Sequence, residues 1–377
     1  MELPVTNGID RLVRGVVELP RSARLGLLTN RAALSTVGEW TGTVLLELGY
    51  RVALLLTPEH GLTVDAAAGA PVGHSLMGDT PVLSLYGADL APVERALEAI
   101  DVVVVDLPDV GCRYYTYGWT VREALKLATQ HTKPVYCLDR PNPLDGVTIE
   151  GSRPDAGYDS AVCASSVPVR HGLTLGELAL WNRHALNLDV DVVVLATEGW
   201  RRDIAWAHTG LPWAPPSPAM SSAETAEIYP GTCLIEGTNI SEGRGTEAPF
   251  RTIGAPFLDG GSLAAALRSD DAFTEVAVEP IGFTPQSSKW AGQMCHGVRL
   301  TVNHRSKFHP VRAGLALVAA LATHQEFAFL PGHFDALAGT ASWRERLTRG
   351  VTPTEIAEDW ESDEAEFRIE REAFLLY

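Results

Sequence analysis

Three short apolar runs in the first 140 residues lead into acidic residues set among turn-forming residues. The runs and the acids that follow them are RVALLLT (51–57) before Glu59, DVVVV (101–105) before Asp106 and Asp109, and PVYCL (134–138) before Asp139. Such continuous apolar runs, separated by helix-like stretches, are typical of buried parallel strands. Because ligands of parallel sheets bind outside the carboxyl ends of the strands, we expect these acids to line a cleft at one edge of a sheet.

Strand-like and helix-like segments alternate through the first 200 residues. Strands are predicted at 24–29, 51–57, 101–106, 134–138 and 191–195, and helices at 39–48, 91–99, 119–130 and 175–185. The last of these helices begins with a capping box, TLGE at 174–177. The alternation predicts an α/β fold with a Rossmann-like, doubly wound parallel sheet.

Residues 211–218 (LPWAPPSP) interrupt this pattern with four prolines in eight residues. Proline excludes both helix interior and central strand, so we expect a domain junction here. The expected parts are a Rossmann-like catalytic domain of residues 1–218 and a smaller C-terminal α+β domain of residues 219–377 that completes the cleft. In the second part we expect Ser262 to cap a helix at 263–268 and Thr352 to cap another, with strands at 275–278 and 298–302.

Charge and cysteine usage limit the partners and the compartment. The net charge of −17 argues against nucleic acid and against an anionic membrane surface. The first fifteen residues (MELPVTNGIDRLVRG) lack the apolar core of a secretion signal, and no apolar stretch reaches bilayer length. Five cysteines without CxxC spacing indicate free thiols in a reducing compartment, so we expect a cytoplasmic protein.

Motif searches give no sign of a cofactor or a metal ion. The chain has neither GxGxxG nor a P-loop, and no HExxH pattern follows the histidine of PEHG. A GxSxG nucleophile elbow is also absent. We therefore expect no cofactor and no metal.

Glu59, in the PEHG sequence at 58–61, is the sharpest catalytic candidate. Proline before it and glycine after it hold its carboxyl group in a turn just past a buried strand, where partial exclusion of water suits a general acid. His60 is expected to orient Glu59 or to contact the ligand. The alternative is a turn or helix-cap acid with no catalytic role.

Two further segments follow predicted strands and mix charge with aromatic rings or prolines. Aromatic rings beside charged groups suit a sugar, and a rigid loop suits a preorganised site. In both segments a purely structural loop is the alternative, in the first one with Arg113 paired to Asp106 or Asp109. The candidates are Asp106, Asp109, Arg113 and Tyr115 in the first segment, and Asp139, Arg140 and Asn142 in the second.

Residues 235–246 (IEGTNISEGRGT) form the densest polar cluster of the second part. The glycines would let the backbone approach a ligand closely, although a surface glycine-rich loop is the alternative. The candidates here are Glu236, Asn239, Ser241, Glu242 and Arg244. Together these features indicate a polyol or sugar-like ligand and carboxylate acid/base chemistry.

Motifs along almost the whole chain resemble the bacterial exo-β-N-acetylmuramidase family of glycoside hydrolases. They are PEHG, SLYG (84–87), the DVGxRYYTY and LDRPNP segments, RHGLTLGELA (170–179), YPGTCLIEGTNISEGRGT and the closing REAFLLY. The chain departs from the family pattern at Pro108 and Ala219. The resemblance implies a Rossmann-like domain with a C-terminal auxiliary domain, a cleft between them, and release of N-acetylmuramic acid (MurNAc) from the non-reducing end of peptidoglycan fragments.

The resemblance also implies roles for individual residues. Glu59 would be the general acid, and Glu236 or Glu242, less favourably Asp139, the second carboxylate. The lactyl carboxylate of MurNAc needs a cation, which Arg113, Arg140 or Arg244 could supply. His171, in the RHGLTLGELA motif, joins the substrate-binding candidates. The expected partner is a muropeptide-derived sugar such as an imported disaccharide.

Two other functions stay open at this point. A non-catalytic binding protein for cell-wall sugars would use the same cleft without needing a carboxylate pair. A glycosyltransferase would also suit a Rossmann-like domain. However, the DxD sequence at 189–191 leads into a predicted strand, and so lies at the end of the sheet away from the expected cleft.

Overall fold

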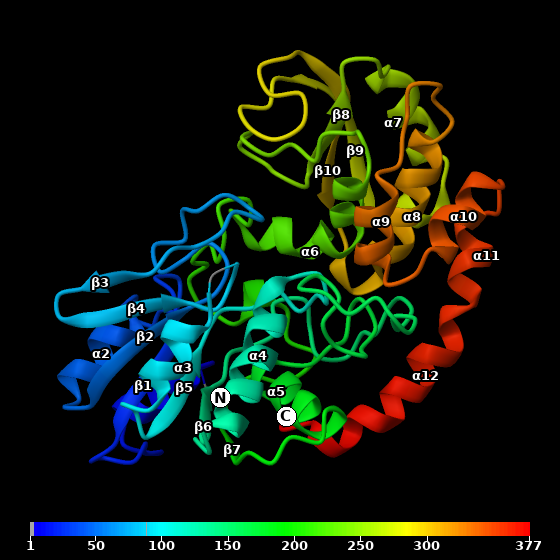
Figure 1. Cartoon of the computed structure of the whole chain (residues 1–377). Helices are drawn as coiled ribbons and strands as arrows, with labels where there is room; N and C mark the ends of the chain where they lie inside the picture. Colours follow the sequence, from blue (N-terminus) through cyan, green and yellow to red (C-terminus); the bar gives the residue numbers. More distant parts are fainter. Residues whose placement is uncertain (1–3, 88) are drawn as a thin grey trace.

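A seven-stranded sheet forms the first part of the computed structural model, which describes residues 4–87 and 89–377 (Figure 1). Its order is β3-β4-β2-β1-β5-β6-β7, and all neighbours are parallel except the β3–β4 hairpin. The strands are β1 (Arg24–Thr29), β2 (Arg51–Thr57), β3 (Ser75–Met77), β4 (Thr80–Ser84), β5 (Val102–Asp106), β6 (Val135–Leu138) and β7 (Val192–Leu195). The predicted Rossmann-like α/β fold is confirmed, and the strand order reverses between β1 and β5.

Helices cover both faces of this sheet because its strands alternate between two cores. In β5, for example, Val102 and Val104 face one hydrophobic cluster, while Val103 and Val105 face the other. The helices of the first part are α1 (Gly8–Val13), α2 (Thr41–Glu47), α3 (Ala91–Leu97), α4 (Thr116–Gln130) and α5 (Leu175–Ala185), with the 3₁₀ turn η1 (Trp206–His208). Residues of α1 and α2 join the first cluster, and residues of α3, α4 and α5 join the second.

The second, smaller part is built on an antiparallel sheet of three strands in the order β8-β10-β9, as the predicted α+β class requires. The strands are β8 (Thr252–Ala255), β9 (Val276–Phe283) and β10 (Cys295–Val302). The α-helices are α6 (Ala223–Thr232), α7 (Gly260–Arg268), α8 (Pro310–Leu321), α9 (Pro331–Ala338), α10 (Ser342–Thr348), α11 (Pro353–Glu358) and α12 (Trp360–Glu370). The 3₁₀ turns are η2 (Cys233–Gly237), η3 (Asp271–Phe273), η4 (Arg305–Lys307) and η5 (Arg371–Phe374).

Helix caps agree with the sequence in two of three places. Thr174 caps α5 and Thr352 caps α11, as predicted, and each belongs to a capping box. The Ser262 cap is wrong, because α7 begins two residues earlier, at Gly260. Asp259 caps it by accepting a hydrogen bond from the Ser262 N–H at 2.6 Å.

The last residues of the chain return to the first part. Figure 1 shows α12 running from the second part toward α5, so the chain passes between the two parts a second time. Arg371 donates to the carbonyls of Val147 and His171, and the Tyr377 ring packs on Trp200 at 5.1 Å. Residues 360–377, which the sequence assigned to the second domain, therefore contact the first. Among the described residues, no helix has both the length and the apolarity needed to cross a bilayer.

Candidate active site

A cavity of about 790 Å³ lies where the two parts of the chain meet. This size falls in the range typical of small-molecule sites. The first part contributes the loop after β2 and the start of α4, and the second contributes η2, the glycine-rich segment after it and the start of α9. The three predicted catalytic acids, Glu59, Glu236 and Glu242, all line this cavity, as do His60, Tyr115 and Arg244.

Glu59 is held in the cavity wall by neutral hydrogen-bond donors. It is 6% exposed, and one carboxyl oxygen accepts from the Gly69 N–H at 2.6 Å. The other oxygen accepts from the Thr116 hydroxyl at 2.7 Å. Burial raises the pKa of Tyr86 to about 12, with the charge of Glu59 and a hydrogen bond to it adding to the effect. Among these partners none carries a positive charge.

A tight turn aims Glu59 at the cavity. His60 and Gly61 both have left-handed backbone angles, with φ of 70° and 75°. Such angles suit glycine and are strained for most other residues. The His60 ring stabilises the turn through a hydrogen bond of 2.7 Å between its Nδ1 and the Ala66 carbonyl.

Cations surround the acids of the opposite wall. Arg244 donates to a carboxyl oxygen of Glu236, and its Nε lies 3.1 Å from Glu242. Lys289 pairs with the other oxygen of Glu242 at 2.9 Å. Burial acts to raise the pKa of Glu236, but the contact with His333 and the charge of Arg244 outweigh it and lower that pKa to about 2.

The two acids differ in how far they can reach a ligand. Glu242 is 2% exposed, and its oxygens contact Arg244, Lys289 and the Ser288 hydroxyl. The Glu236 side chain is 18% exposed, and its second oxygen faces His333 at the longer distance of 3.7 Å. Glu236 is therefore the more accessible carboxylate, whereas Glu242 is the shared ion-pair partner of Arg244 and Lys289.

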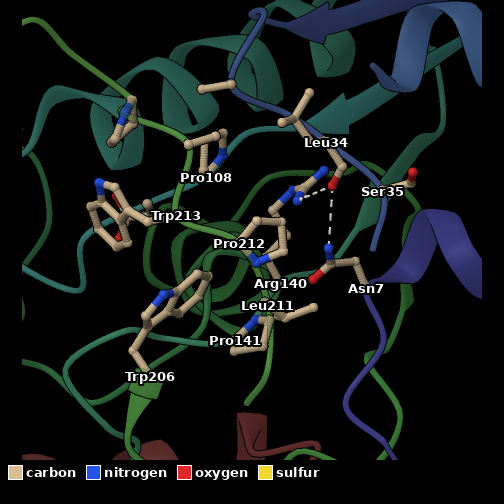
Figure 2. A pocket seen from close by; sticks show the side chains of 14 residues that line it. Asn7, Leu34, Ser35, Pro108, Arg140, Pro141, Trp206, Leu211, Pro212 and Trp213 are labelled. Atoms are coloured by element: carbon tan, nitrogen blue, oxygen red, sulfur yellow. Dashed lines mark hydrogen bonds between the residues drawn. The ribbon is translucent and has the colours of Figure 1, made fainter. Parts of the chain in front are cut away.

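Asp106 and Arg140 lie outside this cavity and bind each other. The Arg140 guanidinium contacts Asp106 at 2.5 and 3.0 Å, and the Thr41 hydroxyl donates to the same acid. Figure 2 shows the surroundings of Arg140, where the Leu34 carbonyl accepts from both Arg140 and Asn7. The sequence alternative paired Asp106 or Asp109 with Arg113, whereas the structure pairs Asp106 with Arg140. Both residues are held in a structural ion pair.

The pocket of Figure 2 lies at the β1/β5 switch point, where doubly wound sheets usually bind ligands. Its free volume is about 30 Å³, enough for one or two water molecules. Trp206, Pro212 and Trp213 are among the residues that line this pocket. Asp109 also lines it, where burial raises the pKa of that acid to about 7 despite a hydrogen bond from the Gly111 N–H.

Asp139 anchors other chain segments. It accepts from the Thr174 hydroxyl at 2.7 Å, from the Gly176 N–H at 2.9 Å and from the Tyr377 hydroxyl at 2.7 Å. Burial raises its pKa to about 6, although these hydrogen bonds oppose the rise. Asp139 therefore joins the start of α5 to the end of the chain.

Five other candidates also lie outside the cavity lining. Asn142 accepts from the Leu144 N–H and donates to the Leu173 carbonyl. His171 is 1% exposed, its pKa is lowered to about 3 by burial, and its Nδ1 accepts from the Leu173 N–H. Arg113 donates to the backbone carbonyls of residues 152, 167, 337 and 338. Asn239 bonds to the backbone of residues 326 and 328, and the Ser241 hydroxyl accepts from the Gly243 N–H.

Several cavity residues were not among the predicted site residues. Tyr86 follows β4, a strand that was not predicted, and Thr116 sits at the start of α4, before the predicted start at 119. Lys289 lies between β9 and β10, outside the candidate motifs. His333 has no local motif at all. No group of three or more His, Cys, Asp or Glu side chains in the described ranges could hold a metal ion.

The fold and the cavity together define a class of protein. Carboxyl groups from two walls of a sugar-sized cleft, one held by neutral partners and one by cations, are the arrangement of a glycoside hydrolase.

Comparison with known proteins gives the family. Residues 25–224 match the N-terminal domain, and residues 227–377 the C-terminal domain, of the exo-β-N-acetylmuramidase NamZ. The chain therefore belongs to the NamZ family of exo-β-N-acetylmuramidases, and the expected resemblance is confirmed. It is 38% identical to the peptidoglycan β-N-acetylmuramidase NamZ of Bacillus subtilis (strain 168), over 99% of this chain and 91% of the relative.

Solved structures support the same relationship. Two DUF1343 family proteins from Bacteroides fragilis NCTC 9343 match with TM-scores of 0.89 and 0.76, each at 27% sequence identity. Both matches cover 100% of this chain, and 100% and 99% of the respective relatives.

Proposed function

We propose that this glycosidase releases MurNAc from the non-reducing end of peptidoglycan fragments such as the disaccharide MurNAc-GlcNAc. In this proposal Glu59 protonates the glycosidic oxygen and Glu236 is the second carboxylate. The observation that carries it is the contrast between the two acids across one cavity: Glu59 has neutral partners, whereas Glu236 has cationic ones.

This contrast matches what the two steps need. Two carboxyl groups in different charge environments are typical of an acid/base pair, in which the group without a cationic neighbour is the general acid. The second group must be a carboxylate when the oxocarbenium-like transition state forms, whether it acts as base or as nucleophile. The lowered pKa of Glu236 keeps it ionised at neutral pH. Glu242 then acts as the counter-ion that orients Arg244.

Substrate contacts follow from the remaining cavity residues. Arg244 is the one of the three expected arginines that lines the cavity, and we assign to it the lactyl carboxylate of MurNAc. Its guanidinium also lies 5.0 Å from the centre of the Phe250 ring, which fixes its orientation. Tyr115, Tyr229 and Phe250 offer apolar surface to the faces of the sugar ring.

We further propose that the substrate is an imported disaccharide hydrolysed in the cytoplasm. All five cysteines are buried free thiols, which fits a reducing compartment. Fractionation of cells that produce the protein tests this: MurNAc-releasing activity is expected with the cytosolic fraction, and recovery outside the cell membrane would contradict it.

The glycosyltransferase alternative is not supported. A nucleotide-sugar donor would be expected at the β1/β5 switch point, which the Asp106–Arg140 pair and the 206–216 segment occupy. A non-catalytic sugar-binding protein would use the same cavity but hydrolyse nothing, so an activity measurement distinguishes it from a hydrolase.

The test is incubation of the full chain with MurNAc-GlcNAc and quantification of free MurNAc. The wild type should release MurNAc, Glu59→Gln should lose at least a hundredfold in kcat, and the matched control Glu94→Gln, on the exposed face of α3, should keep full activity. Absence of release by the wild type, together with calorimetric binding of the disaccharide, would replace the hydrolase by a binding protein. Normal release by Glu59→Gln would reject only the role of Glu59.

A further inference from the structure

His60 lies beside the proposed acid in a conformation that the loop around it fixes. It lines the cavity but is only 5% exposed, so its ring forms part of the wall. Its backbone has a φ of 70°, a strained angle that persists only where the surroundings enforce it. The enforcing contacts are reciprocal: the Ala66 N–H donates to the His60 carbonyl at 3.3 Å, and the His60 ring bonds to the Ala66 carbonyl at 2.7 Å.

The second of these bonds determines which ring nitrogen carries the proton. A carbonyl oxygen can only accept, so Nδ1 of His60 must be the donor. In a neutral imidazole the other nitrogen, Nε2, is then unprotonated and acts as an acceptor. Among the described residues Nε2 has no hydrogen-bond partner, and the ring borders the cavity.

We propose that Nε2 of His60 accepts a hydrogen bond from a hydroxyl or amide N–H of the sugar bound next to Glu59. The inference rests on the proposed function, since it requires a sugar in this cavity. It makes His60 a specificity-determining contact that rejects sugars without a donor at that position. The strained turn and the buried ring hold this acceptor in place before the substrate arrives, which lowers the entropic cost of binding.

The first measurement is the tautomer itself. In protein labelled with ¹⁵N-histidine, two-bond proton–nitrogen correlation spectra assign the His60 ring, with His60→Asn identifying its signals. Nε2 is expected without a proton, and addition of MurNAc should shift its resonance. A proton on Nε2, or a resonance that MurNAc leaves unchanged, would overturn the proposal.

The second measurement separates the contact from the structure of the loop. His60→Asn keeps a residue that tolerates positive φ and an amide N–H near the place of Nδ1, but it removes Nε2. We expect about a tenfold loss in kcat/KM on MurNAc-GlcNAc, with an unchanged thermal midpoint. His60→Ala, which also loses the bond to Ala66, should lower both kcat/KM and the thermal midpoint. Wild-type kcat/KM in His60→Asn would reject the contact.

Failure of the proposed function gives a different result. If the wild type releases no MurNAc but MurNAc shifts the Nε2 resonance, the hydrolase is rejected and the histidine contact stands. If the wild type is active and His60→Asn is equally active, the contact is rejected and the hydrolase stands.

Discussion

At the scale of single residues, the neighbours of each acid in this chain determine its role, since the carboxyl groups themselves are chemically alike. Glu59, Asp106 and Asp139 all follow parallel strands, yet Glu59 meets neutral donors at a cavity, Asp106 meets Arg140, and Asp139 meets the end of the chain. A carboxyl group needs both access and a suitable environment to act on a substrate. Of these three, Glu59 has both.

The two acids of the opposite wall should respond differently to the same substitution. Glu236→Gln should lower kcat on MurNAc-GlcNAc at least a hundredfold with little change in stability. Glu242→Gln leaves Arg244 and Lys289 without their shared partner, and loss of a buried partner typically costs about 3 kcal/mol of unfolding free energy. Urea unfolding and kinetics on both variants check this. The reverse pattern, with Glu242→Gln stable but inactive, would exchange their roles.

Buried Glu150 should make stability depend on pH. Burial raises its pKa to about 7, above the ordinary value of 4.5, against a hydrogen bond from the Arg312 N–H and the charge of Arg170. The native state therefore holds this proton more tightly than the unfolded state, so ionisation destabilises the fold as pH rises from about 4.5 to 7. Glu150→Gln removes that cost. Its stability relative to wild type should increase between pH 5 and pH 8 in urea titrations, and a difference independent of pH would contradict the assignment.

At the scale of elements, the sequence predicted what local patterns encode. The strands β1, β2, β5, β6 and β7 were found because each is a continuous apolar run, and α5 because its capping box is local. The hairpin β3–β4 was missed, since β3 has only three residues and both strands lie in a segment rich in glycine and proline.

Long-range contacts explain why the site was predicted only in part. Asp139 and Glu59 have the same local sequence pattern, each following a buried strand. However, Asp139 accepts a hydrogen bond from Tyr377, which lies at the other end of the sequence. His333 reaches the cavity from α9 with no motif to announce it. Such pairings depend on how the two parts pack, which periodicity and turn chemistry do not encode.

The capping boxes of α5 and α11 offer a matched comparison. Thr352, at α11, bonds only within its exposed box, where replacement by alanine typically costs about 1 kcal/mol. Thr174, at α5, is buried and also donates to Asp139. Thr174→Ala therefore leaves a buried carboxyl group short of one donor, and should cost about 2–3 kcal/mol. Equal losses in urea unfolding would show that the bond to Asp139 adds nothing.

At the scale of the whole molecule, two chain crossings set how the parts meet around the cavity. The first is the proline-rich segment before α6, which also lines the cavity through residues 217–220. The second is α12 with the residues after it, which we call the C-terminal strap (360–377). Its contacts to the first part include Arg153 with Glu370, Trp181 with Phe367, and Tyr377 with Asp139. A cleft held at two places should open less than one with a single hinge.

Removal of residues 371–377 tests the strap. The truncated chain loses the Arg371 bonds to the carbonyls of Val147 and His171, and the Tyr377 bond to Asp139. Since the strap would then reach the first part only through α12, for example through Glu370 with Arg153 and Phe367 with Trp181, we expect KM for MurNAc-GlcNAc to rise several-fold while kcat falls less. We also expect calorimetry to resolve two unfolding transitions where the full chain shows one. Tyr377→Phe, which keeps the ring on Trp200 but not the hydroxyl, is the matched control and should retain a single transition. A truncated chain with one transition and an unchanged KM would show that residues 371–377 do not help to hold the two walls of the cavity together.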